Sequence, residues 1–227
     1  STMPKKQPPN DAPAKKRVLI VDDHPIFRAG LTSLVNLETE LAVCGEANDA
    51  AQAMHALEKL HPDLVLLDMS LPGKGGLELL KDIRAIAPQT PVLIISMHDE
   101  TLYAERVIKA GGRGYIMKQE GPEKIVQAIR KVLGGGISVS ERIAAQILDA
   151  MSGSKGGTST SVSTLTDREF EVYRLLGQGK EPHEIARTLH LSIKTVDTHR
   201  AHIRQKLGLR NATELIHHAT RWTAEQG

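Results

Sequence analysis

Short apolar runs alternate with amphipathic segments along the first half of the chain. The runs are rich in Val, Ile and Leu, which is typical of buried strands, and they cover residues 17–22, 41–45, 64–68, 91–96 and 114–117. Between them, apolar residues such as Phe27, Leu31 and Leu34 recur at helical spacing. Strands that alternate with helices predict a parallel sheet with right-handed crossovers.

Five strand–helix units in a row narrow the fold further. They predict a flavodoxin-like (βα)5 domain of the α/β class, with strand order 2-1-3-4-5. The second half of the chain has a different pattern, with helical periodicity only. Thr166 and Glu169 have the spacing of a capping box, so a helix is expected to begin at Asp167. Three more helices are expected at about 182–190, 193–207 and 212–222, which predicts an all-α four-helix domain.

Composition shifts divide the chain into four parts. Residues 1–16 are rich in Pro and Lys and are expected to form a disordered N-terminal extension. The α/β domain covers 17–137. Residues 138–164 are expected to hold a linker helix at about 139–151 and then a flexible linker rich in Gly, Ser and Thr. The four-helix domain covers 165–227.

The overall composition excludes several classes of protein. The 227 residues carry a formal net charge of +2, so a nucleic-acid or membrane partner must be argued from local charge. Cys44 is the single cysteine, which excludes an intramolecular disulfide and a cysteine-based zinc site. No apolar stretch approaches the roughly 18 residues of a membrane span, and no signal-peptide pattern is visible. We therefore expect a cytoplasmic protein without a membrane partner.

Polar residues that suit phosphoryl chemistry follow four of the apolar runs. Asp22 and Asp23 follow the first run, Asp68 ends the third, Ser96 ends the fourth and Lys118 follows the fifth. Because the carboxyl ends of parallel strands lie along one edge of a sheet, these side chains are expected to converge. The sequence therefore predicts one site with three carboxylates, a hydroxyl and an ammonium.

Each of these groups has a role in phosphoryl transfer. A carboxylate can attack phosphorus and form an aspartyl-phosphate. Further carboxylates can hold Mg²⁺, which prefers oxygen ligands and offsets the charge of two anionic reactants. An ammonium and a hydroxyl can bind the remaining phosphoryl oxygens.

Four segments, VLIVDDHP, PDLVLLDMSLPGKGG, VLIIS and GYIMK, closely resemble the CheY-like receiver domain of bacterial response regulators. The resemblance implies a receiver domain over 17–137 with Asp68 as phosphoacceptor. It implies Mg²⁺ or Mn²⁺ bound by Asp22, Asp23, Asp68 and a backbone carbonyl from Met69 or Ser70, with Ser70 favoured. It also implies that Ser96 and Tyr115 form the switch pair and that Lys118 contacts the phosphoryl group.

A basic helix is expected near the end of the chain. Residues 194–210 carry five basic residues and a single acid, Asp197. The preceding short helix and the turn His190–Ser192 complete a helix-turn-helix pattern, in which the second helix enters the major groove of DNA. For charge alone, a basic amphipathic helix in a small bundle is an alternative interpretation.

Residues 165–215, which include SIKTVDTH, resemble the LuxR-type helix-turn-helix. The resemblance implies that residues 193–207 form the recognition helix. Its phosphate-side candidates are Lys194, Thr195 and Arg204, and its base-edge candidates are Asp197, Thr198 and Ala201. Lys206 is a further DNA-contact candidate, and His199 is expected to make either a packing contact or a phosphate contact.

The two resemblances together imply a two-component response regulator of the NarL/FixJ family. A sensor histidine kinase would phosphorylate Asp68, and the resulting population shift would control sequence-specific binding to a double-stranded DNA operator and hence transcription. Loss of contacts between the two domains would free the recognition helix. A homodimer of the phosphorylated protein is expected, and RNA polymerase is a further candidate partner.

Two other functions remain open at this stage. A metal-dependent hydrolase that uses Asp68 would need an acid or base partner motif, which the sequence lacks, so no enzyme with an external substrate is expected. The second alternative is a phosphorylation-independent DNA-binding or interaction protein with a receiver fold. Incubation with acetyl phosphate distinguishes it from a phosphorylated regulator.

Overall fold

The structure is a computed structural model, and it describes residues 14–152 and 162–226 of the chain. Residues 1–13 of the predicted N-terminal extension and 153–161 of the predicted linker lie outside the described residues. Within the described ranges, none of the helices combines the length and the apolar composition that crossing a bilayer requires.

Five parallel strands form one sheet in the first half of the chain. Their bounds are β1 (Lys16–Val21), β2 (Leu41–Ala47), β3 (Leu64–Asp68), β4 (Val92–Ser96) and β5 (Gly114–Met117). The strand order is β2-β1-β3-β4-β5, which confirms the predicted flavodoxin-like α/β fold. The central strands β3 and β4 are buried along their whole length, which explains why they are uniformly apolar until their last residues.

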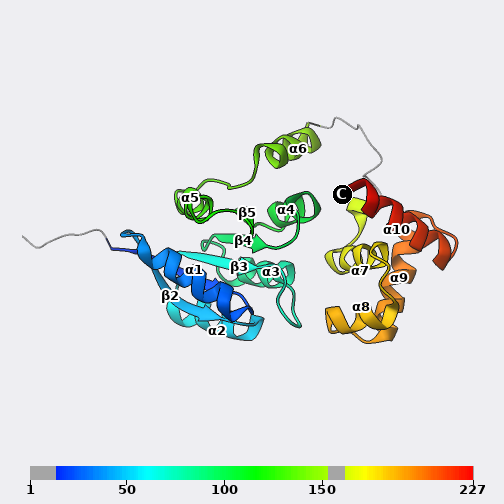
Figure 1. The fold of residues 1–227 in the computed structure, drawn as a ribbon, viewed down its shortest axis with the longest axis horizontal. Helices are drawn as coiled ribbons and strands as arrows, with labels where there is room; N and C mark the ends of the chain where they lie inside the picture. Colours follow the sequence, from blue (N-terminus) through cyan, green and yellow to red (C-terminus); the bar gives the residue numbers. More distant parts are fainter. Residues whose placement is uncertain (1–13, 153–161, 227) are drawn as a thin grey trace, which may run out of the picture.

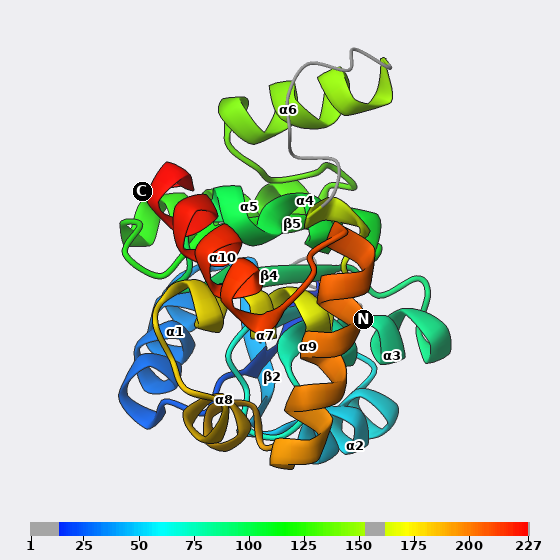
Figure 2. The same cartoon turned by 90° about the vertical axis from the view of Figure 1, so that its right-hand side faces the viewer.

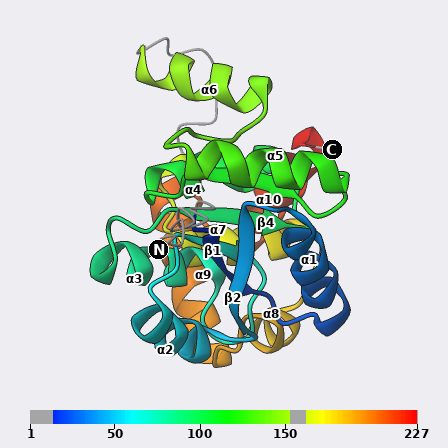
Figure 3. The same ribbon diagram turned by 90° about the vertical axis from the view of Figure 1, so that its left-hand side faces the viewer.

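Helices cover both faces of the sheet (Figures 1 and 3). The helices are α1 (Pro25–Leu37), α2 (Ala50–Leu60), α3 (Gly76–Ile86), α4 (Glu100–Lys109) and α5 (Pro122–Leu133). Alternate strand residues point to opposite faces. Val18 and Ile20 therefore pack with α1 and α5, whereas Leu19 and Val21 pack on the side of α2, α3 and α4.

The C-terminal domain consists of four helices after a short 3-10 turn, Val162–Thr164. They are α7 (Asp167–Gly177), α8 (Pro182–Leu189), α9 (Ile193–Leu207) and α10 (Ala212–Gln226). The capping box of Thr166 and Glu169 is present at the start of α7. Ser192 caps α9 through its side chain, and Gly208 ends α9 in a left-handed conformation with φ +67°. The last helix runs beyond its expected end at about residue 222.

The helix that follows the α/β domain, α6 (Glu141–Met151), is attached to that domain. The Ser140 hydroxyl donates to Glu100 Oε1 over 2.7 Å, and Ile143 is buried where α6 packs on α4. Figures 1 and 2 show α6 projecting beyond α4. The N-terminal part of the predicted linker region is thus packed structure.

The two domains meet through α7 and the segment that precedes it. Asp167 accepts from Lys81 Nζ at 2.6 Å and from Arg106 at 3.2 Å, so it joins α7 to both α3 and α4. Arg174 Nε donates to the Tyr103 hydroxyl over 3.0 Å. Among the described residues, no hydrogen bond or ion pair between the domains involves α9. Figures 1 and 2 show α9 on the side of the C-terminal domain that faces away from the sheet, whereas the C-terminal end of α10 turns back toward the receiver.

Candidate phosphoacceptor site and DNA-binding helix

The acidic residues meet where β1 and β3 end side by side. Val21 pairs with Leu67 across the two strands, so the next residues, Asp22 and Asp68, lie next to each other. Both of these carboxylates are buried, while the side chain of Asp23 is 31% exposed. The structure therefore brings together the three predicted carboxylates at one edge of the sheet.

Lys118 completes the charge arrangement from the end of β5. Its backbone N–H donates to the Ser96 carbonyl over 2.7 Å, which fixes where the side chain begins. Its Nζ lies 2.7 Å from Asp22 Oδ2 and 3.1 Å from Asp68 Oδ2, and its side chain is almost fully buried. One ammonium thus faces two carboxylates in a buried place, and the site retains excess negative charge.

Burial at this site changes the pKa of the predicted phosphoacceptor, Asp68. Burial raises the pKa of Asp68 above its usual range, the charge of Lys118 opposes the shift, and the charge of Asp22 adds to it. The backbone N–H of Ser70 donates to Asp68 Oδ1 over 3.2 Å and favours the ionised form. A bound cation would favour that form further.

The donor set suits a divalent cation with oxygen ligands. One buried oxygen each of Asp22, Asp23 and Asp68 accepts no hydrogen bond of good geometry, although two of them face the Lys118 ammonium. Ligand atoms of these three residues and of His24 lie within 4.8 Å of one another. Mg²⁺ takes oxygen ligands, and one or two carboxylates commonly hold it in proteins, so this cluster fits the cation.

The backbone after Asp68 favours one of the two candidate carbonyl ligands. The Met69 carbonyl accepts from Gly76 N over 2.9 Å at the start of α3. Gly76 is required there, because a Cβ would lie 2.6 Å from the Asp68 carbonyl oxygen. Since the Met69 carbonyl already has a donor, the Ser70 carbonyl is the better candidate.

The two predicted switch residues are both bound to His98. Ser96 is fully buried, and its Oγ accepts from the His98 backbone N–H over 3.0 Å. The buried Tyr115 hydroxyl donates to the His98 carbonyl over 2.8 Å. Because Ser96 Oγ is the acceptor in its bond, its own hydrogen remains available for a phosphoryl oxygen.

His24 lies at the same site, and the sequence analysis did not find it. Its Nδ1 lies 3.1 Å from Asp23 Oδ1, 3.3 Å from Asp22 Oδ1 and 3.7 Å from Asp68 Oδ2. Its position directly after the two aspartates is the signal that could have identified it.

On α9, the predicted base-edge residues lie on the surface. Asp197, Thr198 and Ala201 are exposed, whereas Val196 and Ile203 are buried against the rest of the domain. Asp197 Oδ1 accepts from Arg200 over 3.1 Å. The helix therefore presents small side chains in its middle, with its acid already paired.

The phosphate-side candidates flank that surface. Lys194 is exposed, and Arg204 is half-buried. The Thr195 hydroxyl lies 2.8 Å from Ser192 Oγ, within the cap of the helix. The Thr198 hydroxyl donates to the Lys194 carbonyl over 3.0 Å, which leaves its oxygen free to accept.

The remaining two candidates on α9 face the start of α7. Lys206 Nζ lies 2.7 Å from Glu169 Oε2, and Glu169 is buried. Nδ1 of His199 is buried without a hydrogen bond, and burial lowers the pKa of this imidazole. Lys206 thus has an intramolecular partner, and packing is the better description of His199.

Comparison with known proteins agrees with this geometry. Residues 18–130 match the family described as "Response regulator receiver domain", and residues 163–219 match "Bacterial regulatory proteins, luxR family". The chain is 31% identical to the oxygen regulatory protein NreC of Staphylococcus carnosus, over 89% of this chain and 96% of that protein. It is 32% identical to the nitrate/nitrite response regulator protein NarL of Escherichia coli K12, over 90% of this chain and 94% of that protein.

A solved structure extends the similarity to the whole described chain. RcsB from Salmonella enterica serovar Typhimurium, bound to promoter rprA in the presence of phosphomimetic BeF₃⁻, matches with a TM-score of 0.63 and 26% identity. The match covers 91% of this chain and 98% of that one.

Proposed function

This chain belongs to the NarL/FixJ family of response regulators, with a receiver domain and a LuxR-type DNA-binding domain. From that premise we propose that a sensor histidine kinase phosphorylates Asp68 and that this phosphorylation controls transcription in the cytoplasm. One observation carries the proposal. The buried carboxylate of Asp68 lies against Lys118 and beside two further carboxylates, as phosphoryl transfer to an aspartate requires. In this proposal the acceptor of the phosphoryl group is the protein itself.

In the proposed reaction, a carboxylate oxygen of Asp68 attacks the phosphorus of a phosphohistidine. The P–O bond forms, the P–N bond breaks, and the kinase imidazole leaves. Asp22, Asp23, Asp68 and the Ser70 carbonyl would hold Mg²⁺ or Mn²⁺, which when bound offsets the negative charge of the reactants. Lys118 shifts from a carboxylate to a phosphoryl oxygen, and the Ser96 hydroxyl donates to another.

The test is phosphorylation by acetyl phosphate in Mg²⁺, read as an acid-stable mass increase of the intact protein and its loss on hydroxylamine treatment. Wild type is expected to gain one phosphoryl group, and Asp68→Asn none. Asp149→Asn, a change at an exposed residue of α6, is the matched control and is expected to behave as wild type. A wild type that gains no phosphate, or an Asp68→Asn variant that gains as much, contradicts the proposal.

A continuous set of contacts leads from the switch residues to the DNA-binding domain. Ser96 binds the His98 backbone, and the His98 ring lies 5.3 Å from the Tyr103 ring. Tyr103 in turn meets Phe170 of α7 in an edge-to-face contact at 5.4 Å and accepts from Arg174. We propose that movement of Ser96 toward the phosphoryl group shifts His98 and weakens the contact with α7, as a population shift between two domain arrangements.

From the sequence, loss of contacts between the domains is expected to free α9, but the observed contacts favour a different effect. The inter-domain bonds reach α7, and α9 faces away from the receiver (Figure 2). Phosphorylation would therefore act by repositioning the DNA-binding domains relative to each other, with α9 already accessible. Lys194, Thr195 and Arg204 would contact phosphates, and Asp197, Thr198 and Ala201 would contact base edges.

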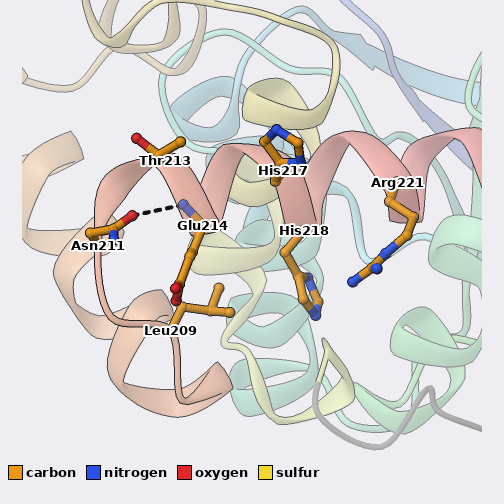
Figure 4. Close-up of a pocket in the computed structure, with 7 residues that line it drawn as sticks. All are labelled: Leu209, Asn211, Thr213, Glu214, His217, His218 and Arg221. Atoms are coloured by element: carbon orange, nitrogen blue, oxygen red, sulfur yellow. Dashed lines mark hydrogen bonds between the residues drawn. The ribbon is translucent and has the colours of Figure 1, made fainter.

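The surface of α10 is the proposed dimer contact in the DNA-bound protein. An open hollow of about 400 Å³ lies beside this helix (Figure 4). Leu209 lines this hollow, and Ile216, a half-exposed residue of α10, adds apolar surface on the same helix. A second copy of this domain would cover them and place two α9 helices on half-sites about one helical turn apart. RNA polymerase is the proposed partner at promoters.

A further inference from the structure

His24 stands over the acidic site in a position that the backbone fixes. It is the N-cap residue of α1, and Pro25 follows it as the first helical residue. The His24 backbone N–H donates to Asp22 Oδ1 over 2.7 Å, so the residue is held to the site independently of its ring. The ring is 60% exposed, and its Nδ1 points to the carboxylates. A ligand that enters from solvent would meet this nitrogen.

Two carboxylate oxygens that face this nitrogen accept no hydrogen bond of good geometry. Asp23 Oδ1, 3.1 Å from His24 Nδ1, is buried and accepts no hydrogen bond of good geometry. Asp68 Oδ2, at 3.7 Å, faces Lys118 and also lacks such a bond. Three potential ligand atoms of two chemical kinds, one imidazole nitrogen and two carboxylate oxygens, thus lie within 4.8 Å of one another.

We propose that His24 is a nitrogen ligand that widens the metal specificity of this site from the oxygen-preferring cations Mg²⁺ and Mn²⁺ to Co²⁺, Ni²⁺ and Zn²⁺. The inference rests on the proposed metal-assisted phosphorylation of Asp68 and concerns the same site. Mg²⁺ takes oxygen ligands, whereas Co²⁺, Ni²⁺ and Zn²⁺ bind imidazole strongly. Asp23 and Asp68 would serve both classes of cation, and His24 would contribute to the second class alone.

The chain carries a natural comparison for this site. Glu169, His199 and His202 also place their ligand atoms within 4.8 Å of one another. There, however, the single carboxylate of Glu169 is balanced by the ammonium of Lys206, 2.7 Å from its Oε2. At His24, three carboxylates face the one ammonium of Lys118, so negative charge remains to attract a cation. The cluster beside α9 is therefore expected to bind transition metals more weakly than the site at His24.

The experiment is calorimetric titration of the full-length protein with CoCl₂ and, separately, with MgCl₂. The proteins are wild type, His24→Asn and His202→Asn, each checked for helical content by circular dichroism. For His24→Asn, Co²⁺ affinity is expected to fall about tenfold or more, the scale seen when a metal site loses a supporting residue, while Mg²⁺ affinity changes by less than about twofold. His202→Asn is expected to keep the Co²⁺ affinity of the main site.

Proton NMR of the Co²⁺-loaded protein supplies a second readout. The ring C–H signals of one histidine are expected far outside the ordinary range in wild type and to be missing in His24→Asn. Equal loss of Co²⁺ and Mg²⁺ affinity in His24→Asn would overturn the inference, because His24 would then act only by orienting the carboxylates. Unchanged Co²⁺ affinity, or a loss in His202→Asn alone, would overturn it as well.

The two proposals fail in distinguishable ways. Phosphorylation of wild type by acetyl phosphate in Mg²⁺ alone is measured on the same preparation. If wild type is phosphorylated but Co²⁺ binding does not depend on His24, only the inference about His24 falls. If wild type gains no phosphate, the proposed phosphorylation of Asp68 is contradicted, whatever the Co²⁺ titrations show.

Discussion

The phosphoacceptor site and the recognition helix α9 are built in opposite ways. The site collects side chains from the ends of four strands, and Asp22, Asp68 and Ser96 are fully or almost fully buried there. Helix α9 carries its candidate contacts on one element and mostly on the surface. In the first region each group has several partners within the protein, so removing one leaves others unpaired. In the second region most groups face water, so removal costs mainly the contact with DNA.

The largest effect is expected at Lys118. Lys118→Met leaves Asp22 and Asp68 buried without their ammonium, so the free energy of unfolding without divalent cations should fall by about 3–5 kcal/mol. Chemical denaturation measures this change, and added Mg²⁺ should restore part of it. Lys109→Met is the matched control: its Nζ lies 2.6 Å from Glu105 on an exposed helix face, so it should cost at most about 0.5 kcal/mol. Equal small losses in both variants would remove the contrast between buried and exposed charge.

An intermediate effect is expected on α9. Lys194→Ala removes a candidate phosphate contact, so affinity should fall by a similar factor for every DNA sequence, and the salt-dependence slope should decrease by about one. Fluorescence anisotropy over a series of salt concentrations measures both quantities.

Asp197→Ala should have the opposite signature. Removing this acid should raise affinity for unrelated DNA, because repulsion of phosphates is lost, and lower discrimination between a selected duplex and an unrelated one. If Lys194→Ala changed discrimination and Asp197→Ala did not, the division of α9 into phosphate-side and base-edge positions would be wrong.

The smallest effect is expected at His98, which lies between the phosphoacceptor site and α7 of the DNA-binding domain. The pKa of His98 is lowered to about 4 from its ordinary value of 6.5, first by burial and then by the charges of Arg174 and Lys118. Because the folded pKa lies below the unfolded one, His98 contributes stability that is fully present above about pH 6.5 and is lost as the pH falls through about 4.

Arg174→Met should therefore raise the pKa of His98 and reduce the stability lost on acidification. An NMR titration of the imidazole signals measures the pKa, and Arg187→Met, at an exposed position of α8, is the control. An unchanged pKa in Arg174→Met would mean that α7 and His98 are not coupled electrostatically.

Some features of both regions could be predicted from the sequence alone. Convergence of Asp22, Asp68 and Lys118 followed from strand alternation, because parallel strands end at one edge whatever their side chains do. The start of α9 followed from Ser192, a local cap. These features depend on neighbours in sequence or on regular geometry.

Other features depend on contacts between distant residues, which periodicity does not encode. From the sequence, Lys206 is one of several basic residues of a surface helix. Its ion pair with Glu169 of α7 is visible only in the structure. The bond between Arg174 and Tyr103 depends on how the two domains dock. The position of His24 after Asp23 indicates that it lies near the site, but the approach of its Nδ1 to all three carboxylates is visible only in the structure.

The central claim is that phosphorylation of Asp68 governs how α9 binds DNA. The most direct measurement is the affinity of the full-length protein for a duplex selected from random sequences, with and without acetyl phosphate and Mg²⁺. Wild type is expected to gain about 5- to 150-fold in affinity, the usual range of coupling between two sites, and Asp68→Asn is expected to gain nothing. An equal gain in Asp68→Asn, or an unchanged affinity in wild type shown by mass to carry the phosphoryl group, would contradict the claim.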